Sequence, residues 1–360
     1  MNGTTLAIFY KNHAFNLTSP FQDQCENSTD ITSFLGTSYS LLTIIGLLGN
    51  LCLICVIARQ KEKSNVTNTL IANLAFSDII VCLFCLPATV VSIIKKHWLF
   101  GEGLCKLTNF LQCASVTVST LSLILIALER HQLIINPTGW KPNITQAYIA
   151  IAMIWIAAGL LSLPFITYSI LNTELHRKFS FAVESSAGKG ACMEHWPSVQ
   201  HRLIYTTFMF VFQYCVPLFF IFLCYLRIYL RLRRRKDLFE RSEYNSRMSH
   251  IKRVNVMLAA MVAAFALCWL PFYVFNTIYE WNHEAIAVCH HDLIFSLCHL
   301  MAMMSTFVNP IIYGFLNNNF KKEVKSLIQN CKRNSSASIE CEHYPLSTMQ
   351  SEVSKGSMKM

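Results

Sequence analysis

The sequence predicts an all-α membrane protein built on a bundle of seven transmembrane helices. Of the 360 residues, 53% are hydrophobic and only 14% are charged, whereas soluble domains carry about 25% charged residues. The few charges leave long apolar runs at about 34–58, 67–94, 105–131, 147–170, 204–230, 254–279 and 290–315. A helix needs roughly 20 apolar residues to cross a bilayer, and each run is long enough.

Basic residues predict the orientation of this bundle. The first run is followed by Arg59, Lys61 and Lys63, and the segment from Arg227 to Arg253 contains ten Lys or Arg against three acidic residues. Cytoplasmic loops of membrane proteins are enriched in Lys and Arg. We therefore expect an extracellular N-terminus and a cytoplasmic C-terminus, and we assign the net charge of +10 to the membrane surface rather than to nucleic acid.

The first 34 residues are polar and contain three N-glycosylation sequons, at Asn2, Asn16 and Asn27. Such sequons are used on the extracellular side. This segment is therefore expected to be an extracellular, glycosylated N-terminus.

The third run is expected to be the central helix. It has no charged residue from Leu107 to Leu128. Its polar residues recur at helical spacing on one face, namely Thr108, Gln112, Ser115, Ser119 and Ser122. Because lipid would not solvate this stripe, it should face protein or a water-filled cavity.

The remaining runs contain one deep carboxylate and several prolines. Asp78 lies within the second run, where an unpaired charge would cost several kcal/mol, so it requires a partner or a function. Five of the ten prolines fall inside runs, at Pro87, Pro164, Pro217, Pro271 and Pro310. We expect these prolines to kink the helices and act as hinges.

An amphipathic membrane-surface helix is expected after the seventh run, with Phe320, Val324, Leu327 and Ile328 on one face. Cys331 at its end is a candidate palmitoylation site, the alternative being a free thiol. The Ser- and Thr-rich remainder is expected to be disordered. The predicted parts are the N-terminus, the bundle, the surface helix and the cytoplasmic tail, at 1–34, 35–315, 316–331 and 332–360.

Each run also carries a short motif, and the motifs follow one another in a fixed order. They are Gly49-Asn50, Leu74 with Asp78, Glu129-Arg130-His131, Trp155, Pro217 with Tyr225, Cys268-Trp269-Leu270-Pro271, and Asn309-Pro310-Ile311-Ile312-Tyr313. With these motifs the chain resembles the rhodopsin-like G-protein-coupled receptors over roughly 35–330.

Longer stretches resemble the neuropeptide Y receptor family in particular. They are 129–137, 268–276, 281–283, 313–317 and 346–348. Within that family the chain is most similar to the pancreatic polypeptide (type four) branch, through 136–142, 283–286 and 352–357. The resemblance implies a plasma-membrane receptor for amidated peptides of the neuropeptide Y, peptide YY and pancreatic polypeptide family, whose ligands end in Arg-x-Arg-Tyr-amide.

The resemblance also implies a binding site. Amine receptors carry a carboxylate at the position of Gln112, so a small cationic amine is not expected. Glu280 would pair with a ligand arginine, while Gln112, Asn276 and His299 would hydrogen-bond the terminal residues; for His299 a satisfied core histidine is the alternative. Glu194, Glu284 and Asp292 would make the rim acidic. Relatives usually have Asp at the Glu280 position, and Lys95 and Lys96 make the rim near the second run basic.

A switch and an ion site are implied as well. Arg130 would pair with Glu129 at rest and be freed on activation, with Tyr225 and Tyr313 nearby. Trp269 would pivot on Pro271, and Asn309 and Pro310 belong to the seventh-run motif. Asn50, Ser119 and Asn309 would surround Asp78 as an allosteric sodium site, the alternative being a structural polar cluster. No other cofactor is expected.

Two disulfides are implied by the family, Cys105–Cys192 and Cys25–Cys289. The implied partners are an inhibitory G protein that lowers cyclic AMP, arrestin and receptor kinases acting through the tail, and membrane lipid. A receptor for another amidated peptide, such as an RF-amide, is the nearest alternative, and a seven-span transporter is a distant one. An enzyme is not expected, because the sequence shows no paired carboxylates, no nucleophile with a base and no phosphate-binding loop.

Overall fold

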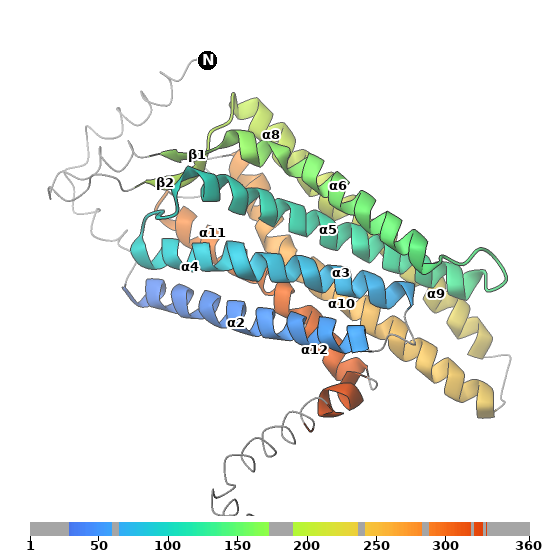
Figure 1. Ribbon diagram of the computed structural model, residues 1–360. Helices are drawn as coiled ribbons and strands as arrows, with labels where there is room; N and C mark the ends of the chain where they lie inside the picture. The colour runs from blue at the N-terminus through green and yellow to red at the C-terminus, as the bar shows by residue number, and fades with distance from the viewer. Residues whose placement is uncertain are drawn as a thin grey trace, which may run out of the picture. The chain divides into compact units, whose positions relative to one another are not determined.

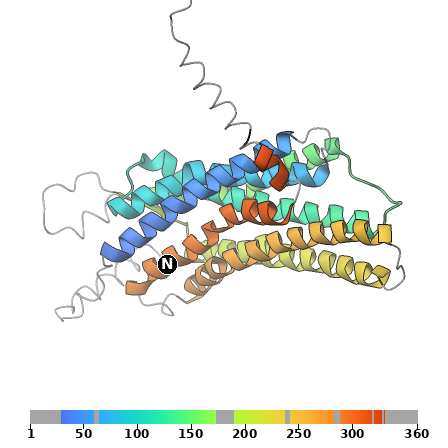
Figure 2. The ribbon, with the colours of Figure 1, turned by 90° about the horizontal axis from the view of Figure 1, so that it is seen from below.

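In the computed structural model, the described residues are 29–59, 65–172, 190–236, 242–282, 288–317, 320–326 and 329. Within this part of the chain, seven helices are long and apolar enough to cross a membrane, which confirms the predicted fold class. They lie side by side as a bundle (Figures 1 and 2). Their bounds are Asp30–Arg59, Val66–Lys95, Gly101–Ile135, Ile144–Tyr168, Val199–Arg234, Ile251–Trp281 and His291–Leu316.

Several spans consist of more than one helical element. In chain order the elements are α2 (Thr29–Arg59), α3 (Val66–Ile80), η3 (Val81–Cys85), α4 (Leu86–Lys95), α5 (Gly101–Ile135), α6 (Ile144–Tyr168), α8 (Val199–Phe208), η4 (Met209–Cys215), α9 (Val216–Lys236), α10 (Ser242–Trp281), α11 (Val288–Met303) and α12 (Ser305–Leu316). The fourth span ends earlier than the apolar run predicts, because a β-strand begins at Ser169.

The elements η3 and η4 are π-helical turns inside the second and fifth spans. The N–H of Leu86 donates to the carbonyl of Val81, five residues back, and the N–H of Val216 donates to Val211 in the same way. Pro87 and Pro217 follow directly. Because a proline lacks the N–H and its ring crowds the preceding turn, a wide turn lets the helix continue past it. The sequence predicted kinks at these prolines but not π turns.

The central position predicted for the third span is confirmed. Helix α5 packs against α3, α6 and α9 and runs between α3 and α6 in Figure 1. Within its apolar stretch 61% of residues are buried, against 17% for α6. Its polar stripe faces inward, since Thr108, Ser115, Ser119 and Ser122 are all buried.

Asparagine side chains cap the starts of α3 and α6. The carboxamide oxygen of Asn65 accepts from the N–H of Asn68 at 2.8 Å and starts α3. Asn143 and Gln146 form a reciprocal capping box at the start of α6. Each cap satisfies N–H groups that have no partner in the first helical turn, which places these helix starts at the asparagines.

A short hairpin joins the fourth and fifth spans. Strands β1 (Ser169–Asn172) and β2 (Ala191–Glu194) pair antiparallel, with Leu171 opposite Cys192. A disulfide links Cys192 to Cys105 near the start of α5. We call this end of the bundle the disulfide end and the opposite end of α5 the Arg130 end.

The chain from Tyr313 onward forms a separate compact unit and is described by itself. Residues 320–326 are helical, and the carboxamide oxygen of Asn317 accepts from the N–H of Phe320 at 3.2 Å. The Phe320 ring packs edge-on against Tyr313, 5.5 Å between ring centres. Residues 320–326 of the predicted 316–331 segment are thus helical, and Phe320 at their start pairs with Tyr313.

Several predictions fall outside the described residues. These are the sequons at Asn2, Asn16 and Asn27, the Cys25–Cys289 pairing, Glu284, the palmitoylation of Cys331 and the tail 332–360. They stay predictions.

Candidate functional site

A hydrogen-bond chain crosses the bundle towards its disulfide end. The Gln112 amide of α5 donates to Nε2 of His299 in α11 at 2.8 Å. Nδ1 of His299 therefore carries the proton and donates to the Tyr39 hydroxyl of α2 at 2.8 Å, which in turn donates to the Ser296 carbonyl at 3.0 Å. The predicted Gln112 and His299 thus lie together, and both ring nitrogens of His299 have partners within the chain.

The predicted Asn276 lies on α10, and its side-chain amide donates to the backbone of its own helix. Its amide donates to the Phe272 carbonyl one turn back, at 2.8 Å. The Phe272 ring packs against His299 and Phe295, with ring centres 5.8 and 5.7 Å apart. Phe272 therefore connects α10 with the seventh span beside the Gln112–His299 pair.

Glu280, at the end of α10, is buried although it carries a charge. Its side chain is 4% exposed, and Oε1 lies 2.8 Å from Nη2 of Arg202 in α8. Next to it, the Trp281 indole N–H donates to the Thr207 hydroxyl of α8 at 3.1 Å. The sequence singled out the carboxylate but missed Arg202, which looked like an ordinary basic residue at the start of a span.

The described residues of the rim carry charges of both signs, as in the prediction from sequence. Glu194 accepts from the Trp196 indole at 2.7 Å. Asp292 is 87% exposed and lies 2.9 Å from His291. Lys95 and Lys96 are both exposed. Acidic and basic side chains therefore share this end of the bundle.

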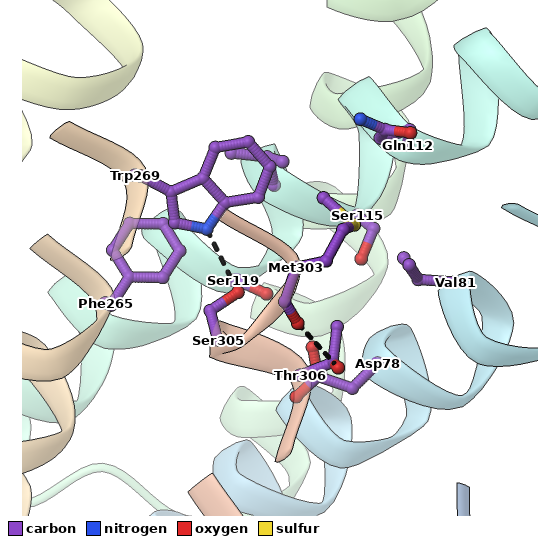
Figure 3. A pocket seen from close by; sticks show the side chains of 11 residues that line it. Asp78, Val81, Gln112, Ser115, Ser119, Phe265, Trp269, Met303, Ser305 and Thr306 are labelled. Atoms are coloured by element: carbon purple, nitrogen blue, oxygen red, sulfur yellow. Dashed lines mark hydrogen bonds between the residues drawn. The ribbon is translucent and has the colours of Figure 1, made fainter. Parts of the chain in front are cut away.

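A small cavity lies beside Asp78 in the middle of the bundle (Figure 3). It has about 10 Å³ of space for the centre of a water-sized sphere, which is room for about one water or small ion. Its polar lining includes Asp78, Ser115, Ser119, Ser305 and Thr306. At one wall, the Trp269 indole donates to the Ser305 hydroxyl at 3.1 Å.

Two of the four predicted ion-site residues line this cavity, and the other two donate hydrogen bonds to residues that line it. Asp78 and Ser119 line it, and the Asn309 amide donates to Oδ2 of Asp78 at 3.1 Å. Asn50 donates to the Thr306 carbonyl at 2.6 Å. Among the described residues its buried carboxamide oxygen has no hydrogen-bond partner.

The chemistry of this donor set fits a small hard cation. One carboxylate and several hydroxyl oxygens are the ligands that such ions prefer. The oxygens of Thr306 and Ser115 were missing from the set predicted from sequence. Within the described part of the chain, no three His, Cys, Asp or Glu side chains converge as they would at a transition-metal site.

Trp269 lies on α10 and lines this cavity, and Pro271 follows two residues later in the same helix. The Trp269 side chain is buried and contacts the rings of Phe265, Phe272 and Tyr273 at 5.8 to 6.1 Å between centres. A rotation of Trp269 would therefore disturb both the cavity and the aromatic cluster of α10.

At the Arg130 end, Glu129 and Arg130 share a third residue. Nε of Arg130 lies 3.8 Å from Oε2 of Glu129. The hydroxyl of Thr67 in α3 donates to Oε2 of Glu129 and accepts from Nη2 of Arg130. The Glu129–Arg130 pair is thus part of a three-residue link between α3 and α5, and Thr67 was not predicted. Its role as a switch stays a prediction.

Tyr225 lies at the same end. Its ring packs against a cluster formed by Ile134, Ile228 and Leu232. Its hydroxyl is buried and has no hydrogen-bond partner among the described residues. Tyr313 belongs to the separate unit described above.

Two further polar networks join spans and were not predicted from sequence. The Trp155 indole donates to Asn73 at 2.9 Å, and Asn73 donates to Ser122 at 2.9 Å, so α6, α3 and α5 are linked. Gln213 in η4 donates to Thr117 of α5 at 2.6 Å and accepts from Tyr273 of α10 at 2.7 Å. Trp155 thus has a structural role in the bundle.

The Cys105–Cys192 disulfide implied by the resemblance is present, with 5.6 Å between the Cα atoms. It ties β2 to the first turns of α5. The rings and aliphatic parts of Trp98, Ala88 and Leu171 pack around it. The hairpin is therefore held over the disulfide end of the bundle.

Known proteins match this chain over most of its length. The family described as "7 transmembrane receptor (rhodopsin family)" matches residues 49–313. The chain is 58% identical over 340 residues to a human protein named Neuropeptide Y receptor type 4-2, covering 94% of this chain and 90% of the relative. It is 56% identical over 352 residues to the mouse Neuropeptide Y receptor type 4, covering 97% and 94%. The Xenopus laevis Neuropeptide Y receptor type 1 is 47% identical over 345 residues, covering 96% and 93%.

Proposed function

The chain belongs to the neuropeptide Y receptor family of rhodopsin-like, multi-pass membrane receptors, and from this we propose that it is a plasma-membrane receptor for amidated peptides of the neuropeptide Y, peptide YY and pancreatic polypeptide family. The identity of 56–58% to type 4 relatives favours pancreatic polypeptide as its ligand. The observation that carries the proposal is the buried Glu280 carboxylate, held at the disulfide end 2.8 Å from a guanidinium nitrogen.

Glu280 is suited to a ligand arginine. A buried carboxylate needs a cation, and guanidinium groups are well matched to carboxylates in geometry and charge. The peptides of this family end in Arg-x-Arg-Tyr-amide, so they supply two such groups. Gln112, Asn276 and His299, grouped with Phe272 deeper in the bundle, would then receive the terminal residues.

The signal would pass through the bundle as a population shift. A ligand that binds one bundle state more tightly than another favours that state by its differential affinity. Thr67, Glu129 and Arg130 hold α3 to α5, and in this proposal that link belongs to the resting state. Opening this link, with Trp269 turning beside Pro271, would free Arg130 to meet an inhibitory G protein and so lower cyclic AMP.

This mechanism needs the disulfide end outside the cell and the Arg130 end in the cytoplasm. The oxidised Cys105–Cys192 pair supports that orientation, because disulfides persist in oxidising compartments. The glycosylated N-terminus would then be extracellular. The Ser- and Thr-rich tail would be available to receptor kinases and arrestin, and Cys331 to palmitate.

A sodium ion at Asp78 would act as an allosteric ligand of the resting state. Asp78, Ser119 and Thr306 would hold it, with Asn50 and Asn309 supporting the carboxylate and its neighbours. The ion would supply a positive charge that neutralises Asp78 in the bundle interior. The cavity beside Asp78 has room for about one such ion.

The test is inhibition of forskolin-stimulated cyclic AMP in cells expressing the chain, titrated with pancreatic polypeptide, peptide YY, neuropeptide Y and an RF-amide peptide. We expect the first three to inhibit, pancreatic polypeptide at the lowest concentration, and pertussis toxin to abolish the response. Inhibition by the RF-amide alone would establish the alternative ligand class. No response to any peptide, together with solute flux in the expressing cells, would favour a transporter.

A further inference from the structure

Glu280 is occupied by a cation of the chain itself. Nη2 of Arg202 lies 2.8 Å from Oε1 of Glu280, which is the geometry of a charge-assisted hydrogen bond. Arg202 comes from α8 and Glu280 from the end of α10, so the pair bridges two spans that pack against each other at the disulfide end.

The two partners of this ion pair differ in their exposure to the surface. The Glu280 side chain is 4% exposed and the Arg202 side chain 38% exposed. The carboxylate is therefore covered, while part of the Arg202 side chain is accessible at the surface of the bundle. A cation arriving from outside the bundle reaches Arg202 before it reaches Glu280.

We propose that Arg202 is a built-in competitor for the ligand: its guanidinium occupies the position on Glu280 that an arginine of the peptide takes, and it must be displaced when the peptide binds. This inference rests on the proposed function, since it concerns the same carboxylate. It adds a residue that sets the affinity and the cation preference of the site.

A second side-chain contact links these two helices beside the ion pair. Trp281 already links α10 to Thr207 of α8 by a hydrogen bond of 3.1 Å. Arg202 also lies in the first turn of α8, where the partial positive charge of the helix N-terminus disfavours a cation. The Arg202 charge is therefore stabilised by Glu280 and not by its place in the helix.

The competition selects for the kind of cation that enters. A group that displaces Arg202 must bind the carboxylate better than a guanidinium already in place. A ligand arginine can do so by presenting two parallel N–H groups, whereas a lysine offers a single point charge. The pair thus favours peptides with arginine at the contacting position over those with lysine.

The experiment measures peptide affinity on membranes from cells expressing the full chain. The probes are pancreatic polypeptide and two analogues in which one or the other C-terminal arginine is replaced by citrulline, which is neutral and similar in shape. Arg202→Gln should bind the arginine peptide about tenfold more tightly, equivalent to about 1.4 kcal/mol. The same substitution should change the affinity of the citrulline analogue that lacks the contacting arginine less than twofold.

Two controls separate competition from other effects. Lys106→Gln also removes a positive charge at the disulfide end, where Lys106 lies 2.6 Å from the exposed Glu102, and it should change affinity less than twofold. In the Glu280→Gln background, Arg202→Gln should give no gain. Arg202→Met, also uncharged, should reproduce the gain of Arg202→Gln.

Failure of this inference is distinct from failure of the proposed function. If Arg202→Gln lowers affinity or leaves it unchanged while Glu280→Gln weakens binding, Arg202 supports the carboxylate and competition is refuted. If neither uncharged variant reaches the cell surface, Arg202 is needed for folding and competition is likewise refuted. If Glu280→Gln leaves affinity unchanged, the peptide contact itself is wrong.

Discussion

Thr67→Val should raise signalling in the absence of peptide. The Thr67 hydroxyl donates to Glu129 and accepts from Arg130, and the residue is only 2% exposed. Valine has nearly the same shape but no hydroxyl. The substitution therefore removes both hydrogen bonds between α3 and the Glu129–Arg130 pair and leaves the local packing almost unchanged.

The size of the effect follows from the charges involved. A hydrogen bond to a charged group contributes about 1.5–3 kcal/mol. Glu129 and Arg130 remain next to each other at 3.8 Å and keep part of their attraction, so we take the net loss in the resting state as about 1.5 kcal/mol. An active population of about 1% would then rise to about 10%, since roughly 1.4 kcal/mol corresponds to tenfold.

The assay is nucleotide exchange on purified inhibitory G protein, measured without peptide at matched receptor density. Thr67→Ser keeps the hydroxyl and should stay near the wild-type rate. Thr69→Val is the matched control on the same helix. The Thr69 hydroxyl donates to the backbone carbonyl of Asn65 at 3.2 Å, within its own helix end, and not to the Glu129–Arg130 pair. A Thr67→Val rate equal to that of Thr69→Val would refute a restraining role for the Thr67 link.

Three further predictions concern other parts of the bundle. Asp78→Asn should abolish the effect of sodium on agonist affinity, compared in sodium and choline chloride at equal ionic strength; a sodium effect that survives would exclude Asp78 as the ion ligand. Cys192→Ser removes a disulfide between residues 87 positions apart, which constrains the unfolded chain by about 4–5 kcal/mol. The variant should have a lower melting temperature in detergent and a lower level at the cell surface. Wild-type values for both would contradict a stabilising role of the disulfide. Trp155→Phe leaves the Asn73 carboxamide oxygen without its indole donor. The free energy of unfolding should fall by about 1–3 kcal/mol, with peptide affinity unchanged. Reduced affinity at unchanged stability would place Trp155 in the binding mechanism instead.

The sequence predicted the bundle well because its determinants are local. Charge-free runs long enough for a bilayer can be read directly, and the polar stripe from Thr108 to Ser122 follows from helical periodicity alone. The α5 helix accordingly occupies the centre of the bundle. The Cys105–Cys192 pair came from the family resemblance, since spacing alone does not fix a disulfide.

The partners of the charged residues could not be predicted in the same way. Thr67 and Arg130 are 63 positions apart, and Gln112 and His299 are 187 apart. Whether such residues meet depends on the rotation and tilt of each helix, which apolar periodicity constrains only loosely. Arg202 gave no signal because an arginine at the start of an apolar span is usually an interfacial residue. The π turns before Pro87 and Pro217 were missed because a proline in a sequence does not specify how the preceding turn adapts.

The most direct measurement of the central claim is a double-mutant cycle between Glu280 and the peptide arginines. Peptide affinity is measured for the wild-type chain and Glu280→Gln, each with the arginine peptide and each citrulline analogue. We expect Glu280→Gln and one of the two citrulline replacements to weaken binding more than about tenfold each, and the two together to weaken it scarcely more than either alone. Independent losses that multiply for both arginines would show that Glu280 does not receive the ligand cation.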